Sequence, residues 1–133
     1  MLFEHFAINV PEPNAIANWY VEHVGLTIVR QQSQAPFMTF LADDSGRVLC
    51  ELYCRPEQAM MDFGSQHALT FHFAMESTNA EADKARLIEA GATLFEEQHL
   101  DDGSHLVMLR DPWGICLQLC QRAVRMNKVR LSL

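Results

Sequence analysis

The sequence has no long hydrophobic run and no excess of basic residues. No stretch approaches the roughly 20 apolar residues of a transmembrane helix, and the amino terminus, MLFEHFAINV, has no basic region like that of a secretory signal. Against 17 Asp and Glu there are only 10 Lys and Arg, so the net charge of -7 gives no general attraction to nucleic acid or anionic membranes. These absences favour a cytoplasmic protein whose partner is a small molecule.

Cysteine is scarce, and its positions exclude local disulfides. Cys50 and Cys54 form one pair along the chain, and Cys116 and Cys120 form the other. Four residues along an extended strand span roughly 13 Å, which is too far for a disulfide bond. Glycine-rich phosphate loops, hydrolase nucleophile motifs and Cys–His zinc patterns are also missing. We therefore expect reduced thiols, as in the cytoplasm, and a site built from other residue types.

The first half of the chain predicts one strand, one helix and three further strands. The 133 residues, 49% of them hydrophobic, suffice for one domain with a substantial core. FEHFAINV reads as a strand, and a helix follows Pro11 and Pro13 and ends at Gly25. The next three strands are predicted at LTIVRQQ, PFMTFLA and RVLCELYC.

The second half predicts the same order of elements. HALTFHFAM reads as a strand that begins at His67, and a capping box formed by Thr78 and Glu81 opens a helix that ends at Gly91. The last three strands are predicted at ATLFEEQ, SHLVMLR and GICLQLCQ. The two halves therefore form an internal repeat.

Polar residues occupy matching places in the two halves. The glycine that ends each helix precedes Glu51 by 26 residues in the first half and Gln118 by 27 in the second. His5 and His67 precede those glycines by 20 and 24 residues. Strand alternation places these four side chains on the sheet faces that are turned away from the helices.

Glu51 interrupts the apolar strand LCELYC, and an ionised carboxylate there needs a cation, a water-filled cavity or an outward orientation. Four other histidines lie outside the repeat and are expected to be packed or surface residues. His72 in particular is expected on the face opposite His67. These other histidines are His23, His72, His99 and His105.

This arrangement resembles the vicinal oxygen chelate superfamily, which includes glyoxalase I, methylmalonyl-CoA epimerase, extradiol dioxygenases, fosfomycin-resistance enzymes and bleomycin-binding proteins. The resemblance covers residues 1 to about 122. It implies an α+β fold of two βαβββ modules, residues 1–57 and 66–122, that form paired half-barrels, and it predicts a homodimer. Residues 123–133 would then be a basic tail, either solvated or gripping an anionic substrate.

The resemblance also implies a metal site whose ligands are His5, Glu51, His67 and Gln118. Two imidazoles, a carboxylate and an amide oxygen suit zinc, nickel, cobalt, manganese or ferrous iron. Family members often have glutamate at the place of Gln118, whose amide cannot take a proton near neutral pH. Glu51 is therefore the expected catalytic base.

Two functions of different class follow from the resemblance. The first is a metal-dependent lyase or isomerase of glyoxalase or epimerase type, which acts on a small oxygen-rich substrate through a metal-stabilised enediolate. The second is a metal-free protein that sequesters a small molecule, as bleomycin-resistance proteins do, with Glu51 hydrogen-bonded to His5 or His67. An extradiol-type dioxygenase ranks third because its usual last carboxylate is replaced by Gln118.

Overall fold

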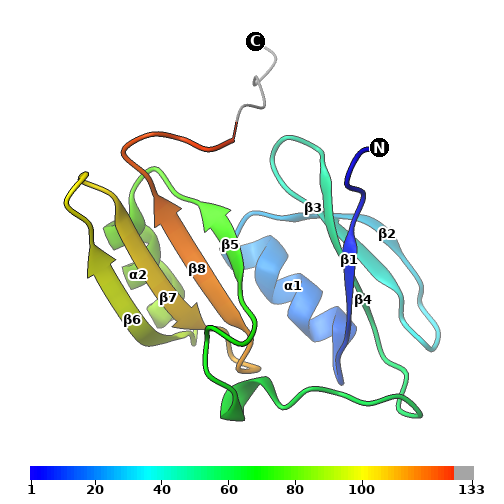
Figure 1. The fold of residues 1–133 in the computed structure, drawn as a ribbon. Helices are drawn as coiled ribbons and strands as arrows, with labels where there is room; N and C mark the ends of the chain where they lie inside the picture. The colour runs from blue at the N-terminus through cyan, green and yellow to red at the C-terminus, as the bar shows by residue number, and fades with distance from the viewer. Residues whose placement is uncertain (128–133) are drawn as a thin grey trace. The chain divides into compact units, whose positions relative to one another are not determined.

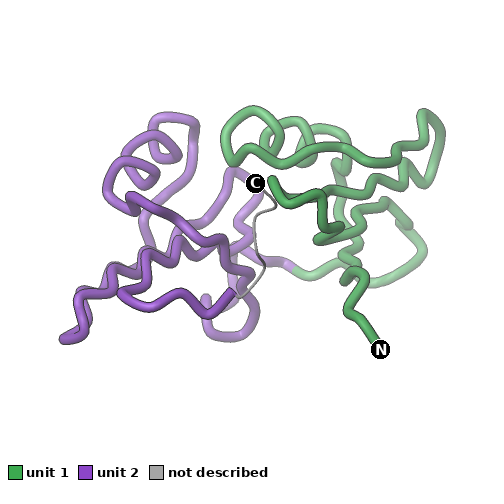
Figure 2. Tube along the Cα trace, turned by 90° about the horizontal axis from the view of Figure 1, so that it is seen from above, with its two compact units in different colours: residues 1–61 green, residues 62–133 purple. Residues whose placement is uncertain are grey.

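The computed structural model describes residues 1–127 and forms two compact units, unit 1 from Met1 to Met61 and unit 2 from Asp62 onward (Figures 1 and 2). Unit 1 contains β1 (Phe6–Asn9), α1 (Pro13–His23), β2 (Thr27–Gln31), β3 (Thr39–Ala42) and β4 (Val48–Tyr53). Unit 2 contains the short 3-10 helix η1 (Phe63–Ser65), β5 (Phe73–Glu76), α2 (Ala80–Glu89), β6 (Thr93–His99), β7 (His105–Arg110) and β8 (Cys116–Gln121). The predicted α+β fold of two βαβββ modules is confirmed.

Both units have the same sheet topology, with strand order β1-β4-β3-β2 in unit 1 and β5-β8-β7-β6 in unit 2. The first and fourth strands of each unit pair in parallel, and the other neighbours pair in antiparallel. The parallel register aligns Ala7 with Glu51 in unit 1 and Ala74 with Gln118 in unit 2. The repeat inferred from spacing is therefore also a repeat of strand register.

A β-bulge at the same place in β2 of unit 1 and β6 of unit 2 strengthens the equivalence of the two units. The register shifts between Ile28 and Arg30 in β2, and between Leu94 and Glu96 in β6. The extra residues, Val29 and Phe95, each follow by four positions the glycine that ends the preceding helix, and both side chains are exposed. A bulge bends an edge strand and increases its local twist.

Each helix covers one face of its own sheet. In α1, Pro13 occupies the first turn, where its missing N–H costs no hydrogen bond, and Ile16, Ala17 and Tyr20 are buried. In the first sheet, Ile8 of β1 and Val10 just after it are buried, while Ala7, which points to the other face, is exposed. The apolar faces of the strands therefore meet the helices, as the alternation predicts.

The start of α2 differs from the predicted capping box. Asn79, and not Thr78, is the N-cap, because the Asn79 side chain accepts the backbone N–H of Ala82 at 3.0 Å. Ser77 adds a second contact by donating its hydroxyl to Asp83 at 2.6 Å. At the other end Gly91 adopts a positive φ of 107°, which closes the helix as predicted.

The strand predicted to begin at His67 is much shorter in the structure, since β5 begins only at Phe73. Residues 67–71 form a turn instead, in which the Thr70 N–H donates to the His67 carbonyl at 2.9 Å. Arg110 holds the preceding segment by donating to the carbonyls of Phe63 at 2.7 Å and Gln66 at 2.5 Å. Charge-assisted bonds to these carbonyls favour an irregular path over pairing with the sheet.

The ends of β1 and β5 hold the chain segments that follow the fourth strands. Asn9 donates to the carbonyls of Arg55 at 2.9 Å and Ala59 at 3.2 Å. Glu76, at the equivalent place in β5, accepts a hydrogen bond from Arg125 Nη2 at 3.0 Å, and this bond holds the pKa of Glu76 below its usual value. Arg125 of the predicted basic tail is thus engaged within unit 2, and Lys128 and Arg130 lie outside the described residues.

Across residues 1–127, neither helix has the length and apolar character needed to cross a membrane.

Gly114 is expected to be the glycine most sensitive to substitution. Its φ is +87°, and an added Cβ would lie 2.8 Å from the backbone of Gly64. Gly46 is a matched control, because its φ is +80° and a Cβ there would meet nothing within 4 Å. We expect Gly46→Ala to cost about 1–2 kcal/mol of unfolding free energy and Gly114→Ala roughly 2–5 kcal/mol, as measured by urea denaturation. Equal losses would contradict this assignment.

Candidate functional site

In unit 1, Glu51 lies in a row of side chains across the open face of the sheet. The strand registers align it with Ala7 on one side and with Phe40 on the other, and Phe40 aligns with Arg30. The Glu51 side chain is 17% exposed, so most of it is removed from water. The carboxylate is therefore neither fully solvated nor buried without a polar neighbour.

That neighbour is His5, which immediately precedes β1. Its Nε2 lies 3.7 Å from Glu51 Oε2, and its Nδ1 lies 2.7 Å from Glu4 Oε1. The Phe40 ring contacts the imidazole edge-on, with the ring centroids 5.2 Å apart. A carboxylate at Nδ1 favours the tautomer with the proton on that atom, which leaves the Nε2 lone pair facing Glu51.

In unit 2, Gln118 takes the place that Glu51 has in unit 1. It aligns with Ala74 and Met108, and Met108 aligns with Glu96. The Cys120 thiol donates to Gln118 Oε1 at 3.4 Å. This weak bond leaves the amide oxygen with acceptor capacity for a ligand.

His67 lies on the turn that packs over this face, next to Ala68, which is buried in a cluster with Met108 and Cys116. Its Nδ1 accepts the Leu69 N–H at 3.1 Å, and its ring contacts Phe95 edge-on at 5.1 Å. A neutral imidazole that accepts at Nδ1 carries its proton on Nε2. In this hydrogen-bonded state neither nitrogen of His67 has a free lone pair.

The hydrogen bonding of His72 is the reverse of that of His67. It precedes Ala74 by two residues, as His5 precedes Ala7, so the register makes His72 the counterpart of His5. Its Nδ1 is 3.0 Å from the Ala68 carbonyl, which can only accept, so Nδ1 carries the proton and Nε2 keeps its lone pair. A histidine that donates Nδ1–H to a carbonyl is the usual form of a metal ligand.

Sequence reasoning missed His72 because alternation was counted along a strand that does not exist before Phe73. A signal was present in the spacing. His72 precedes Gly91 by 19 residues, closer than His67 to the 20 residues between His5 and Gly25. The prediction for His67 as a ligand stays a prediction.

The structure thus brings His5 to Glu51 within unit 1 and places His67, His72 and Gln118 in unit 2. The donor types fit a divalent ion of borderline character, which accepts imidazole nitrogen, carboxylate and amide oxygen. The hydrogen bonding of His5 also suits metal binding, because Nδ1 is held by Glu4 while Nε2 faces a carboxylate.

All four cysteines are free thiols, as predicted, and three of them are buried. Burial raises the pKa of the Cys50 thiol to about 12. Burial also raises the pKa values of Cys116 and Cys120, partly opposed by the charges of Arg110 and Arg122 respectively. Protonated, buried thiols are poor metal ligands and poor nucleophiles.

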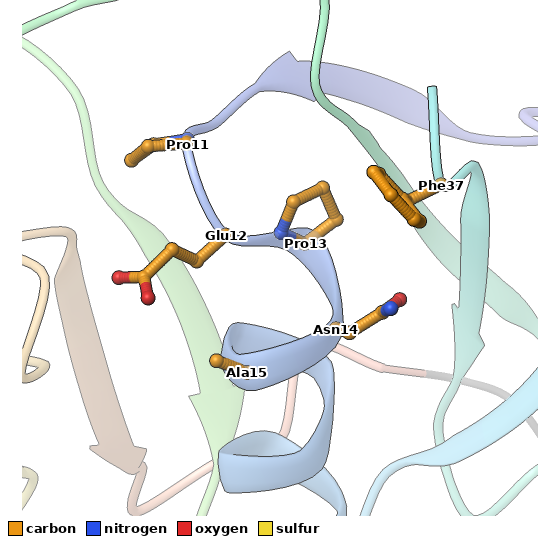
Figure 3. A pocket seen from close by; sticks show the side chains of 6 residues that line it. All are labelled: Pro11, Glu12, Pro13, Asn14, Ala15 and Phe37. Atoms are coloured by element: carbon orange, nitrogen blue, oxygen red, sulfur yellow. The ribbon is translucent and has the colours of Figure 1, made fainter. Parts of the chain in front are cut away.

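A shallow depression of about 250 Å³ lies at the start of α1 (Figure 3). The Phe37 ring lies across from Pro13 there, and Phe37 has a positive φ of 58°, a strained conformation for an aromatic residue. The lining includes neither His5 nor Glu51. It consists of Pro11, Glu12, Pro13, Asn14, Ala15 and Phe37.

Comparison with protein families agrees with the fold. The model of the glyoxalase-like domain matches residues 5–120. The chain therefore belongs to the glyoxalase-like family, and the resemblance inferred from its sequence is confirmed at this level. No curated protein sequence matches it.

Several solved structures share the fold. The antibiotic-binding protein TnmS3 from Streptomyces sp. CB03234 is 21% identical, with a TM-score of 0.65 over 91% of this chain and 95% of that one. Lactoylglutathione lyase from Agrobacterium tumefaciens is 18% identical, with a TM-score of 0.65 over 90% and 92%. A member of the glyoxalase/bleomycin resistance protein/dioxygenase superfamily from Sphaerobacter thermophilus DSM 20745 is 14% identical, with a TM-score of 0.63 over 92% and 98%. At these identities the similarity shows the fold alone.

Thiol reactivity should follow burial. We expect Ellman's reagent at pH 8 to modify Cys54, which is half-buried, well before Cys50, whose pKa of about 12 keeps it protonated. Cys116 and Cys120 should also react slowly, since burial raises the pKa of each. Peptide mapping of partly labelled protein checks the order, with Cys54→Ala as the control that removes the fast phase. Labelling of Cys50 as fast as Cys54 would contradict the burial argument.

Proposed function

We propose that the chain is a divalent-metal-dependent enzyme of the lyase or isomerase class, of glyoxalase or epimerase type, acting on a small oxygen-rich substrate. The observation that carries the proposal is the His5–Glu51 pair. An imidazole whose Nδ1 is held by Glu4 presents Nε2 to a mostly covered carboxylate 3.7 Å away. Membership of the glyoxalase-like family supports it.

In unit 1 the residues proposed as metal ligands are His5 and Glu51, and in unit 2 they are Gln118 and one histidine. When bound, a divalent ion supplies Lewis-acid stabilisation of negative charge on a substrate oxygen. One carboxylate among these ligands leaves the loaded site with a net charge of about +1, which favours an anionic or oxygen-rich substrate.

Glu51 is the residue proposed to move the proton. A carboxylate can take a proton from a substrate carbon and return it, whereas the amide of Gln118 can only bind and orient. His5, tied to Glu4, lies beside Glu51 with Nε2 3.7 Å from Oε2, and the Phe40 ring contacts His5 edge-on. Proton transfer in a partly dehydrated site is the chemistry that this arrangement supports best.

His67 and His72 are competing candidates for the histidine of unit 2. His67 follows from the spacing of the sequence, and its turn packs over the Gln118 face. The hydrogen bonds favour His72, because its Nδ1 faces the Ala68 carbonyl and its Nε2 stays available, whereas the Nδ1 of His67 accepts the Leu69 N–H.

A metal-free binding protein is the second candidate. It is favoured by the neutral Gln118 at the place of Glu51 and by Phe40 and Met108, which give each row an apolar member. The solved antibiotic-binding protein TnmS3 has the same fold. An extradiol-type dioxygenase ranks below both because Gln118 supplies no carboxylate. A homodimer with a small-molecule partner is proposed in each case.

Metal content separates the first two candidates. We expect protein purified without chelators, or exposed to zinc, nickel or manganese, to bind an ion. His5→Ala should weaken this binding at least tenfold because it removes a ligand, and Glu51→Gln because it removes the negative charge of the ligand set. His23→Ala is a matched control, since His23 has similar exposure, 27% against 30%, and lies 3.7 Å from its own carboxylate neighbour, Glu22. Elemental analysis and calorimetry give the measurement. Unchanged binding in the His5 and Glu51 variants would show that the ion is held elsewhere, and would leave the metal-free candidate for this site.

The choice between His67 and His72 requires its own pair of variants. We expect His72→Ala to lower zinc affinity at least tenfold and His67→Ala to change it little, because only His72 offers a free Nε2 in its present hydrogen-bonded state. Calorimetric titration of both variants, at a temperature at which both are folded, gives the measurement. Loss of affinity in His67→Ala alone would restore the ligand set inferred from the sequence.

A further inference from the structure

The helix-facing side of the second sheet carries a separate group of ligating side chains near the β6–β7 turn. Glu97 aligns with Val107 and His99 aligns with His105, one position out of phase with the Met108–Gln118 row. Lys84 of α2 contacts Glu97, which places the group on the face that α2 covers. Figure 1 shows α2 against one face of this sheet, and the register puts the group on that face and Gln118 on the other.

Two imidazoles and one carboxylate converge here. His105 Nε2 lies 2.6 Å from Glu97 Oε1, and His99 Nε2 lies 3.8 Å from the same oxygen. The two imidazole rings are stacked, with centroids 4.1 Å apart and an interplanar angle of 16°. One ligand atom from each of the three residues falls within 4.8 Å of those from the other two. The three side chains are held together by backbone register, because His99 and His105 are cross-strand partners and Glu97 is two residues before His99.

These distances bracket the geometry of a tetrahedral ion. Metal–ligand bonds of about 2.0–2.1 Å place neighbouring nitrogen and oxygen ligands roughly 3.3 Å apart. The His105–Glu97 distance of 2.6 Å would have to lengthen and the His99–Glu97 distance of 3.8 Å would have to shorten, each by well under 1 Å. The stacked rings must also tilt, because an imidazole binds an ion in its own plane, and rotation of the exposed His99 side chain to another rotamer supplies that change.

We propose that Glu97, His99 and His105 form a divalent-cation site, of the zinc, nickel or copper(II) class, distinct from the site that contains His5 and Glu51. The ion would replace the hydrogen of the His105–Glu97 hydrogen bond and tie β6 to β7 next to their turn. Two imidazoles and a carboxylate suit these ions, and the order of affinity for such donors rises toward copper(II). Water completes the coordination.

Lys84 sets how tightly the site binds. Its Nζ contacts Glu97 Oε1 at 3.0 Å and Oε2 at 3.1 Å, and also Glu81 Oε2 at 2.8 Å. The hydrogen bond from Lys84 is the largest cause that lowers the pKa of Glu97. Lys84 can keep Oε2 and Glu81 when Oε1 binds the ion, but its positive charge opposes the cation. We therefore expect micromolar rather than nanomolar affinity.

The three proposed ligands differ in how far their side chains are exposed to solvent. The His105 side chain is 10% exposed, that of Glu97 is 23% and that of His99 is 73%. His105 and Glu97 are therefore mostly covered by neighbouring side chains, while His99 lies where an ion enters from water. Replacement of His99 should remove a ligand without disturbing the core.

The test uses the full chain with His5→Ala and Glu51→Gln, so that the site of the proposed function cannot account for the binding. We expect zinc titration by calorimetry to show one ion bound with micromolar affinity and to raise the thermal unfolding midpoint. Adding His99→Ala or Glu97→Gln should weaken binding at least tenfold, and His99→Cys should retain most of it, because a thiolate also ligates zinc.

Glu96→Gln is the matched control. It removes the same charge from the adjacent residue of the same strand, and the register aligns Glu96 with Met108 on the other face. Binding should be unchanged in this variant. Failure of the background protein to bind zinc at 1 mM free ion, or binding that His99→Ala and Glu97→Gln leave unaltered, would overturn the proposal. Nitrogen-15 spectra of the histidine rings provide a second readout in the unmodified chain, where zinc should shift the signals of His99 and His105.

Discussion

The parallel pairing of the first strand with the fourth in each unit is the constraint on which the rest of the structure depends. It aligns Ala7 with Glu51 and Ala74 with Gln118, and so fixes which side chains share a face. A shift of one residue would turn every polar side chain of the row toward the helix and every apolar one toward the open face. The buried Ile8, Val10, Leu117 and Leu119 make that shift costly, because their side chains would lose the contacts that the helices provide.

Most of the fold could be predicted from the sequence, because alternation and helix stops are local signals. Gly25 and Gly91 end the helices as expected, and Glu51 and Gln118 are interior to the strands where the pattern placed them. The start of β5 could not be predicted, because it depends on Arg110, distant in sequence, holding the carbonyls of Phe63 and Gln66. Reading HALTFHFAM as one continuous strand obscured the equivalence of His72 to His5 in the strand register.

The two faces of the second sheet carry polar groups under different electrostatic conditions. On the open face, Gln118 is neutral and its amide oxygen receives only a weak bond from the Cys120 thiol. On the helix-facing side, Glu97 is flanked by Lys84 and His105, which lower its pKa and keep it ionised. From the sequence, His99 and His105 on this side were expected to be surface or packed residues. The register of β6 with β7 makes His99 and His105 neighbours, and their rings stack.

The paired bulges at Val29 and Phe95 also determine how either sheet can grow. Each sheet has two outer strands, and the bulge distorts one of them, β2 or β6, so that its free backbone groups no longer form an even row. The other outer strand, β1 or β5, is regular but only four residues long. Any additional strand would therefore find a short docking edge on one side and an interrupted one on the other, a design that discourages open-ended polymerisation while leaving room for a limited, closed association.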